Sequence, residues 1–306
     1  MPRPPAPRLY DPHALYVGGL GRCLHSGALR SFISVPADRK ILADNYEMMQ
    51  KWYAFLLGRA QQTTEEQQTG EYAKYTVLNG LDYGEWCEPG ITAMQAMMNP
   101  RKSVGTAYLA YSGRLLAEIA QALGKAEDAA QYRDTAEKAR LAYHAAFTDH
   151  GKITSDRQCE YVRAIAFGLL DEAESQAAAD TLNQMVLDNG CHLNTGFFVH
   201  AVPVKVLAEH GHTDTAYKLL LQDTAPSWLY EVKQGATTVW ETWTGIDEAG
   251  HPQRIAEPLF LRRDLRLAVR RRVRHPSGGP DPDHRSHPEP CTGLGKSGVR
   301  FPGGAH

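Results

Sequence analysis

The chain has 306 residues and a mass of 33.9 kDa, and its 33 basic and 35 acidic side chains nearly cancel, so total charge indicates no particular partner. No segment approaches the ~18 uninterrupted apolar residues that a membrane-spanning helix requires. The five cysteines lack CxxC spacing and the first ten residues lack the apolar stretch of a secretory signal, so we expect a cytoplasmic protein without a disulfide framework or a structural zinc site.

The composition divides the chain into three segments. Residues 1–36 hold six of the 18 prolines and residues 251–306 hold eight, and the last segment carries 11 Lys/Arg against 5 Asp/Glu. Because proline costs ~3 kcal/mol inside a helix, the proline-poor middle, residues 37–250, is the expected helical domain. We interpret residues 1–36 as outside the domain, and the basic tail 251–306 as either disordered or, like the first segment, an out-of-frame translation of a GC-rich gene.

Seven amphipathic helices are predicted in the middle segment from apolar residues at three- and four-residue spacings. Gly124 is predicted to end the second helix, Ser155 or Asp156 to cap the fourth, and Asn189-Gly190 to end the fifth. The only strand signal is Gly235–Trp243. In chain order, the predicted helices are 44–57, 103–123, 126–147, 156–170, 172–187, 197–210 and 213–222.

These elements predict an all-α protein with short connections, which favour antiparallel neighbours. Two architectures fit: a tetratricopeptide-like solenoid and a barrel of helical hairpins. A solenoid would show a repeat of about 34 residues, and no tryptophan, glycine or proline recurs at that period, so the barrel is favoured.

The block Gln234–Gly245 contains a carboxylate between two indoles, Trp240-Glu241-Thr242-Trp243. An indole offers a flat apolar face to a sugar ring, and it desolvates a neighbouring carboxyl, which raises the pKa of that carboxyl toward the range useful for proton transfer. The alternative interpretation is a pair of core tryptophans with Glu241 pointing to solvent.

Two loops add candidate binding residues. Asp82–Gly90 holds three carboxylates and two aromatic residues, including Glu85 and Trp86, and carboxylates accept hydrogen bonds from sugar hydroxyls. The alternative is a polar loop anchored by one buried tryptophan. In the glycine-bracketed turn Gly190–Phe198, His192 is either a ligand donor or the cap of the helix that follows.

Other patterns carry less. His210 and His212 flank a glycine without a third ligand, so no metal site is predicted. The arginine run 270–274 is not accompanied by a nucleic-acid-binding motif. No phosphate-binding loop, dinucleotide fingerprint or nucleophile elbow is present, and no cofactor is expected.

Five ordered motifs between about Asp38 and Gly250 resemble the catalytic domain of bacterial α-L-rhamnosidases, glycoside hydrolase family 78. The family's Y-G-D-W loop is similar to Tyr83–Trp86, with Glu85 where most relatives have Asp. The other four motifs resemble Ala107–Leu116, the helix from Gln158 and Tyr161 to Leu170, His192–Phe197, and the G-A-T-T-[IV]-W-E block at Gly235–Glu241.

The resemblance implies an (α/α)6 six-hairpin barrel, incomplete at both ends, that hydrolyses terminal α-L-rhamnosides with inversion. It implies Glu241 as general base and Trp86 as an aromatic wall of the rhamnose pocket, with further substrate contacts expected from Asp82, Glu85, His192 and Trp240. The expected partner is a rhamnose-containing glycoside, not nucleic acid or a membrane.

Two family blocks have no match here. The D-x-P-x-R-x-E-R-x-G-W-x-G-D block, which supplies the general acid, is not found upstream, and the N-H-Y block is not found after Glu241. We therefore expect little or no hydrolysis by this chain. Two alternatives stay open: a carbohydrate-binding remnant without chemistry, and a helical interaction scaffold whose basic tail binds an anionic partner.

Overall fold

The computed structural model describes residues 39–62, 70–78, 82, 85, 87–92, 95, 102–196, 199, 202–240, 242–246 and 251. All of them belong to the first of the two units into which the chain divides, Met1–Arg270. The predicted segment 1–36 and the tail beyond His251 lie outside the described residues, as do Trp86 and Glu241.

The described residues form helices and one short hairpin, which confirms the all-α prediction. The helices are α3 (Arg39–Gln61), α5 (Lys102–Ala122), α6 (Ala126–Phe147), α7 (Gln158–Ala166), α8 (Glu172–Asp188), α9 (Val202–Glu209), α10 (Thr213–Leu221) and α11 (Trp228–Lys233), with a 3₁₀ turn at Ala73–Tyr75. None of the described helices is long and apolar enough to cross a membrane.

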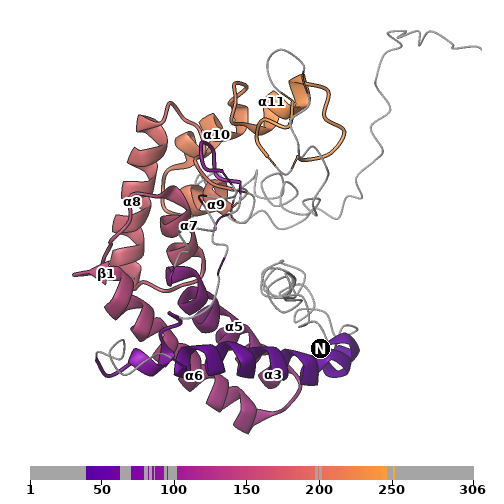
Figure 1. Cartoon of the computed structure of the whole chain (residues 1–306), viewed down its shortest axis with the longest axis vertical. Helices are drawn as coiled ribbons and strands as arrows, with labels where there is room; N and C mark the ends of the chain where they lie inside the picture. The colour runs from indigo at the N-terminus through magenta and orange to yellow at the C-terminus, as the bar shows by residue number, and fades with distance from the viewer. Residues whose placement is uncertain are drawn as a thin grey trace, which may run out of the picture. The chain divides into compact units, whose positions relative to one another are not determined.

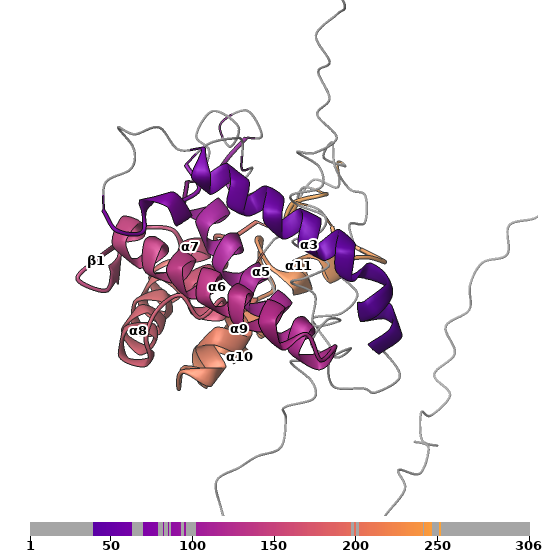
Figure 2. The same ribbon diagram turned by 90° about the horizontal axis from the view of Figure 1, so that it is seen from below.

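Helix α5 is the centre of the first packed layer and lies against both α3 and α6 (Figures 1 and 2). Gly113 makes this close approach possible, because a Cβ there would collide with the Tyr53 hydroxyl of α3 and would lie 2.9 Å from the Ala136 Cβ of α6. Helices α7 and α8 pack on each other, as do α9 and α10. One continuous apolar core runs from Leu42 in α3 to Trp243.

Several helix ends follow the sequence signals. Gly124 has a φ of +79°, and the Lys125 N–H reaches back to the Ala120 carbonyl at 2.8 Å, as expected at a glycine that ends a helix. Helix α8 begins with a capping box in which Asp171 accepts from the Glu174 N–H and the Glu174 side chain accepts from the Asp171 N–H.

The fourth predicted helix was too long and wrongly capped. Neither Ser155 nor Asp156 caps α7; Arg157 is the residue before the helix and its side chain makes no cap bond, while the Ser155 hydroxyl accepts from the Arg157 N–H at 3.3 Å. The helix stops at Ala166 because Gly168 takes a left-handed conformation with a φ of +63°. The helical spacing of apolar residues continues through Leu170, so the spacing alone predicted a helix that ends four residues too late.

The strand prediction was also wrong. Within Gly235–Trp243 the described residues form no strand, because the Trp240 N–H donates to a side chain and no second strand lies beside the segment in the described part. The observed hairpin is instead β1 (Thr148–Asp149) with β2 (Lys152–Ile153), in the register Thr148↔Ile153. Its two-residue turn, His150-Gly151, has positive φ at both positions.

Candidate functional site

The first predicted loop is anchored to α3 by a buried ion pair. Arg59 donates to both carboxylate oxygens of Asp82 at 3.0 Å, and both side chains are buried. Gly105 of α5 leaves room for this pair, since a Cβ there would lie 2.8 Å from Asp82 Oδ2. Each oxygen of Asp82 accepts one bond from Arg59 and keeps capacity for a second, so the ion pair neither shows nor excludes the predicted sugar contact, and that role stays a prediction.

Glu85 points into the protein core. It is 1% exposed, and its Oε2 accepts from Arg163 Nη2 of α7 at 3.2 Å while its Oε1 accepts from the Val199 N–H at 3.0 Å. Its predicted contact with the sugar likewise stays a prediction, and the described geometry gives Glu85 a second task, which is to tie three segments together. Its neighbour in sequence, Trp86, lies outside the described residues.

Charged groups from the first loop, from α7 and from the residue before α7 form a cluster, which we call the acidic cluster: Glu85, Glu88, Glu160, Arg157 and Arg163. All are buried except Arg157, whose side chain is 36% exposed. Arg163 also donates to Glu160 at 2.9 Å, and Arg157 donates to Glu88 at 2.7 Å. The Ser103 hydroxyl of α5 adds a bond to Glu160 at 2.7 Å, and the Cys159 thiol one to Glu88 at 3.3 Å.

The charges of the acidic cluster do not balance when all its carboxyls are ionised, since three carboxylates meet two guanidiniums. Burial, the largest effect, raises the pKa of Glu85 to about 7, and the charges of Glu88 and Glu160 act in the same direction. The Arg163 guanidinium and the Val199 N–H oppose this rise. Glu85 therefore exchanges a proton near neutral pH.

The His192 turn is held by α7. The Gln158 side chain accepts from the Asn194 N–H at 2.8 Å and donates to the His192 carbonyl at 3.4 Å. The His192 ring lies within hydrogen-bond distance of the Asn189 carbonyl (3.2 Å) and of the Thr224 hydroxyl (2.8 Å). The interpretation of His192 as a helix cap is wrong, because its described partners lie in turns and α9 begins only at Val202. Its role as a ligand donor stays a prediction.

The tryptophan block closes over the same turn. The Trp243 indole N–H donates to the Thr195 carbonyl at 2.6 Å, and its ring meets Trp228 edge-on with centroids 5.7 Å apart. Trp240 is 6% exposed, and its ring lies against Gly245, where a Cβ would come within 2.8 Å. The two indoles are thus core residues, and Glu241 between them lies outside the described residues.

A carboxylate in α11 fixes the backbone just before Glu241. Ser227 caps α11 by accepting from the Tyr230 N–H, and Glu231 in the first turn is 4% exposed. The Glu231 Oε2 accepts from the Trp240 N–H at 3.2 Å. Burial raises the pKa of Glu231 to about 7, and this hydrogen bond lowers it by a smaller amount.

Sequence reasoning missed Arg163, Glu160 and Glu231 as parts of the site, and it counted Glu88 among the carboxylates of the first loop without its partners Arg157 and Cys159. A signal existed for the first two, because Glu160 and Arg163 are charged residues three apart on the apolar face of α7, next to the fully buried Cys159 and Val162. Charged groups there need partners inside the core. For Glu231 the sequence held no comparable signal, since a single acid in a short helix is usually solvated.

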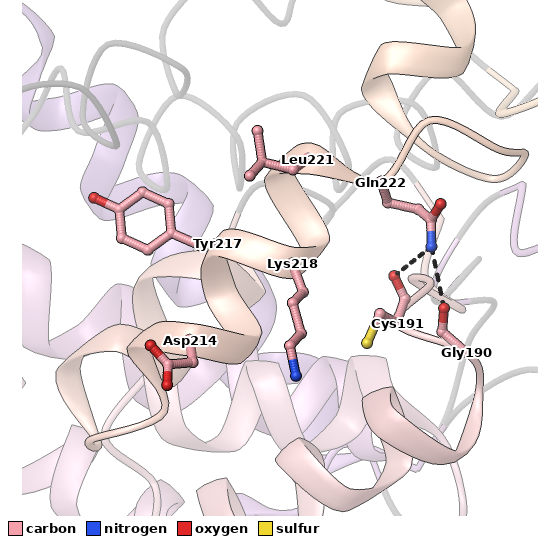
Figure 3. A pocket seen from close by; sticks show the side chains of 7 residues that line it. All are labelled: Gly190, Cys191, Asp214, Tyr217, Lys218, Leu221 and Gln222. Carbon is pink, nitrogen blue, oxygen red and sulfur yellow. Dashed lines mark hydrogen bonds between the residues drawn. The ribbon is translucent and has the colours of Figure 1, made fainter.

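A pocket of about 580 Å³ lies between α10 and the start of the His192 turn, at Gly190 and Cys191 (Figure 3). The Gln222 amide donates to the carbonyls of Gly190 and Cys191, at 3.1 and 3.5 Å, and so forms one wall. Among the described residues, the predicted substrate-binding residues Asp82, Glu85, His192 and Trp240 do not line this pocket. Its lining residues are Gly190, Cys191, Asp214, Tyr217, Lys218, Leu221 and Gln222.

The described residues contain no group of three or more His, Cys, Asp and Glu side chains placed to hold a metal ion. His210 is bonded to the Val206 carbonyl at 2.7 Å and His212 to Asp180 at 2.8 Å, so the two rings are held by different partners.

Comparison with known proteins places these loops in context. A family model described as the bacterial alpha-L-rhamnosidase 6 hairpin glycosidase domain matches residues 33–256. The chain is 34% identical over 215 residues to an alpha-L-rhamnosidase of Formosa agariphila, covering 69% of this chain and 22% of that protein. It is 35% identical over 215 residues to an alpha-L-rhamnosidase of Streptomyces avermitilis, covering 70% and 19%.

The fold has matches among solved structures. The crystal structure of the Streptomyces avermitilis alpha-L-rhamnosidase complexed with L-rhamnose superposes with a TM-score of 0.59 and 34% identity, over 71% of this chain and 19% of that one. An alpha-L-rhamnosidase structure from Dictyoglumus thermophilum gives a TM-score of 0.59 at 26% identity, over 72% and 23%. The chain spans about a fifth of the length of the curated relatives it matches.

Proposed function

Because the chain belongs to the bacterial alpha-L-rhamnosidase six-hairpin glycosidase family, we propose that its loops bind a terminal α-L-rhamnosyl group and that Glu241 is the general base of an inverting hydrolysis. In such a reaction a carboxylate activates water on one face of the sugar while a carboxylic acid protonates the leaving oxygen on the other.

One observation carries the proposal: segments far apart in sequence that hold the family motifs are tied to one another by buried hydrogen bonds. Glu85 of the first loop binds Val199, and Gln158 of α7 binds the His192 turn. The Trp243 indole binds the same turn at Thr195. Loops joined in this way on a rigid helical scaffold are suited to hold a ligand in a fixed geometry.

The residues next to the two key positions support the assigned roles. Glu231 fixes the Trp240 N–H, so the backbone is held immediately before Glu241. The ties that Glu85 makes to Arg163 and Val199 hold the backbone immediately before Trp86. If the backbone next to a catalytic base and a binding aromatic residue is already fixed, less conformational entropy is lost when substrate binds.

We propose that this chain binds L-rhamnose and shows little or no hydrolysis of rhamnosides. A general base alone leaves the departing oxygen without a proton donor, and no segment of the sequence matches the block that supplies the family's acid. The second candidate, a binding remnant, is favoured by the same observation and differs only in having no turnover.

The test combines calorimetry with an activity assay. Purified chain is titrated with L-rhamnose and, as a control sugar, D-glucose, and is incubated with p-nitrophenyl α-L-rhamnoside. We expect selective binding of L-rhamnose, weakened by Trp86→Ala and retained in Glu241→Gln, with any turnover lost in Glu241→Gln. Equal response to both sugars would contradict the proposal.

A matched control locates the binding. Tyr217 is a half-exposed aromatic residue in the α10 pocket, remote from the motif loops in sequence. Tyr217→Ala is expected to leave rhamnose affinity unchanged. If Tyr217→Ala abolishes binding and Trp86→Ala does not, the sugar occupies the α10 pocket and the proposed site is wrong.

A further inference from the structure

Arg163 is a charged side chain that is almost completely enclosed at the proposed site. It is 1% exposed, and its guanidinium uses one terminal nitrogen for Glu160, at 2.9 Å, and the other for Glu85, at 3.2 Å. Glu160 is on the same helix, whereas Glu85 is 78 positions away in the first loop. Arg163 therefore joins α7 to the first loop at Glu85.

Glu85 in turn connects the first loop to the segment at Val199. Its second oxygen accepts from the Val199 N–H, a residue 114 positions later in the segment that follows the His192 turn. A carboxylate is a stronger acceptor than a neutral amide or acid, so the Arg163 charge, which favours the ionised form of Glu85, also strengthens the bond to Val199.

We propose that Arg163 is a positioning residue for the rhamnose site: it draws Glu85 onto α7 and thereby fixes both the backbone leading into Trp86 and the segment at Val199. This inference rests on the proposed function. Arg163 is a positioning residue and not a catalytic one, because its guanidinium is buried in the core and binds two carboxylates there.

The planar fork of arginine suits this task and lysine does not. Two nitrogens in one plane reach two carboxylates at once, whereas an ammonium is a single point charge on a flexible stem. Removing the guanidinium would leave Glu85 and Glu160 buried with one cation fewer, and an uncompensated buried carboxyl takes up a proton. The groups that face Glu85 are Arg163 and Glu160 from α7, Glu88 from its own loop and the Val199 N–H.

The experiment follows the Val199 amide by NMR in the full-length labelled chain, together with L-rhamnose affinity by calorimetry. In the wild-type protein we expect the Val199 amide signal to titrate with Glu85 near pH 7. Glu85→Gln should abolish that titration, and Arg163→Lys should move it to higher pH. Since each variant weakens a buried charged hydrogen bond, we expect about tenfold faster amide exchange at Val199 and about tenfold weaker rhamnose binding.

Ile119→Val is the matched control for general loss of stability. Ile119 is fully buried near the C-terminal end of α5, 16 residues after Ser103, which binds Glu160, so we expect this variant to lower the melting temperature without a change at Val199 or in affinity. Glu85→Gln keeps the side-chain volume, so the inference stays testable if Arg163→Lys fails to fold.

The outcomes separate the two proposals. Altered Val199 signals with unchanged rhamnose affinity in Glu85→Gln would overturn the positioning role and leave the proposed function standing. An unchanged Val199 amide in both variants would overturn it as well. If the wild-type protein binds no rhamnose, the proposed function fails first, and the positioning role falls with it.

Discussion

Replacing Glu231 by glutamine is expected to stabilise the protein at alkaline pH and to leave its stability unchanged at acid pH. The Glu231 carboxyl is buried, and its Oε2 accepts from the Trp240 N–H at 3.2 Å. Glutamine has the same shape and an oxygen that accepts the same bond, but it carries no charge at any pH.

The sign and the size follow from the pKa. Burial raises the pKa of Glu231 from 4.5 to about 7, so the folded state binds the proton more tightly than the unfolded state does. The stability that comes from this proton is complete below about pH 4.5 and is lost as the pH rises through about 7. At ~1.4 kcal/mol per pH unit, the difference between 4.5 and about 7 amounts to about 3 kcal/mol.

The assay is urea unfolding of both proteins at several pH values from 4.5 to 8. The two unfolding free energies should agree at pH 4.5, and at pH 8 the variant should be more stable by about 3 kcal/mol. Glu127→Gln is the control, since Glu127 is exposed in the first turn of α6. Parallel pH curves for wild-type protein and Glu231→Gln would refute the reasoning, because they would show that water reaches the carboxylate.

Three further substitutions test the packing and the ties between segments. Gly113→Ala should cost about 1–3 kcal/mol in chemical unfolding by forcing a methyl group against the Tyr53 hydroxyl, and an unchanged midpoint would mean that α3 and α5 are not in close contact. Trp243→Phe should cost about 1–3 kcal/mol, because the buried Thr195 carbonyl loses its indole donor; a loss below 0.5 kcal/mol, on the order of experimental error, would argue against that bond. Asp171→Ala should lower thermal stability by about 1 kcal/mol by removing the α8 cap, whereas equal melting curves would show that the cap is not formed.

The helices were predictable because their signals are local. The third predicted helix, 126–147, matches α6 at both ends, and Gly124 ends the helix before it as expected. Errors occurred where one local conformation or contact overrides the apolar pattern. Helix α7 ends at Ala166 because Gly168 is left-handed, and the segment from Gly235 is no strand where the Trp240 N–H donates to Glu231, nine residues earlier.

The sequence showed the motifs of the candidate site, but it did not show which buried arginines bind its carboxylates. Asp82 and Glu85 have the composition of sugar ligands, yet each carboxylate is buried against an arginine from another helix. Which arginine meets which acid depends on tertiary packing that neither spacing nor charge count contains. The resemblance to a known family identified the six-hairpin glycosidase domain because motif order can be read from the sequence even where contacts cannot.

The long sequence separations within the acidic cluster bear on the order of folding. The ion pairs that Glu85 and Glu88 make with arginines, and the bond from the Val199 N–H to Glu85, join residues 69 to 114 positions apart, so their formation requires closing large loops. Helix pairs such as α5 and α6, which are neighbours along the chain, do not face that entropic cost. We expect the hairpin of α5 and α6 to form early. The first loop should dock last, and its carboxylates Glu85 and Glu88 become buried in that step. In refolding experiments, slow variants would then be those that alter α5–α6 packing, while changes at Glu85 would mainly accelerate unfolding.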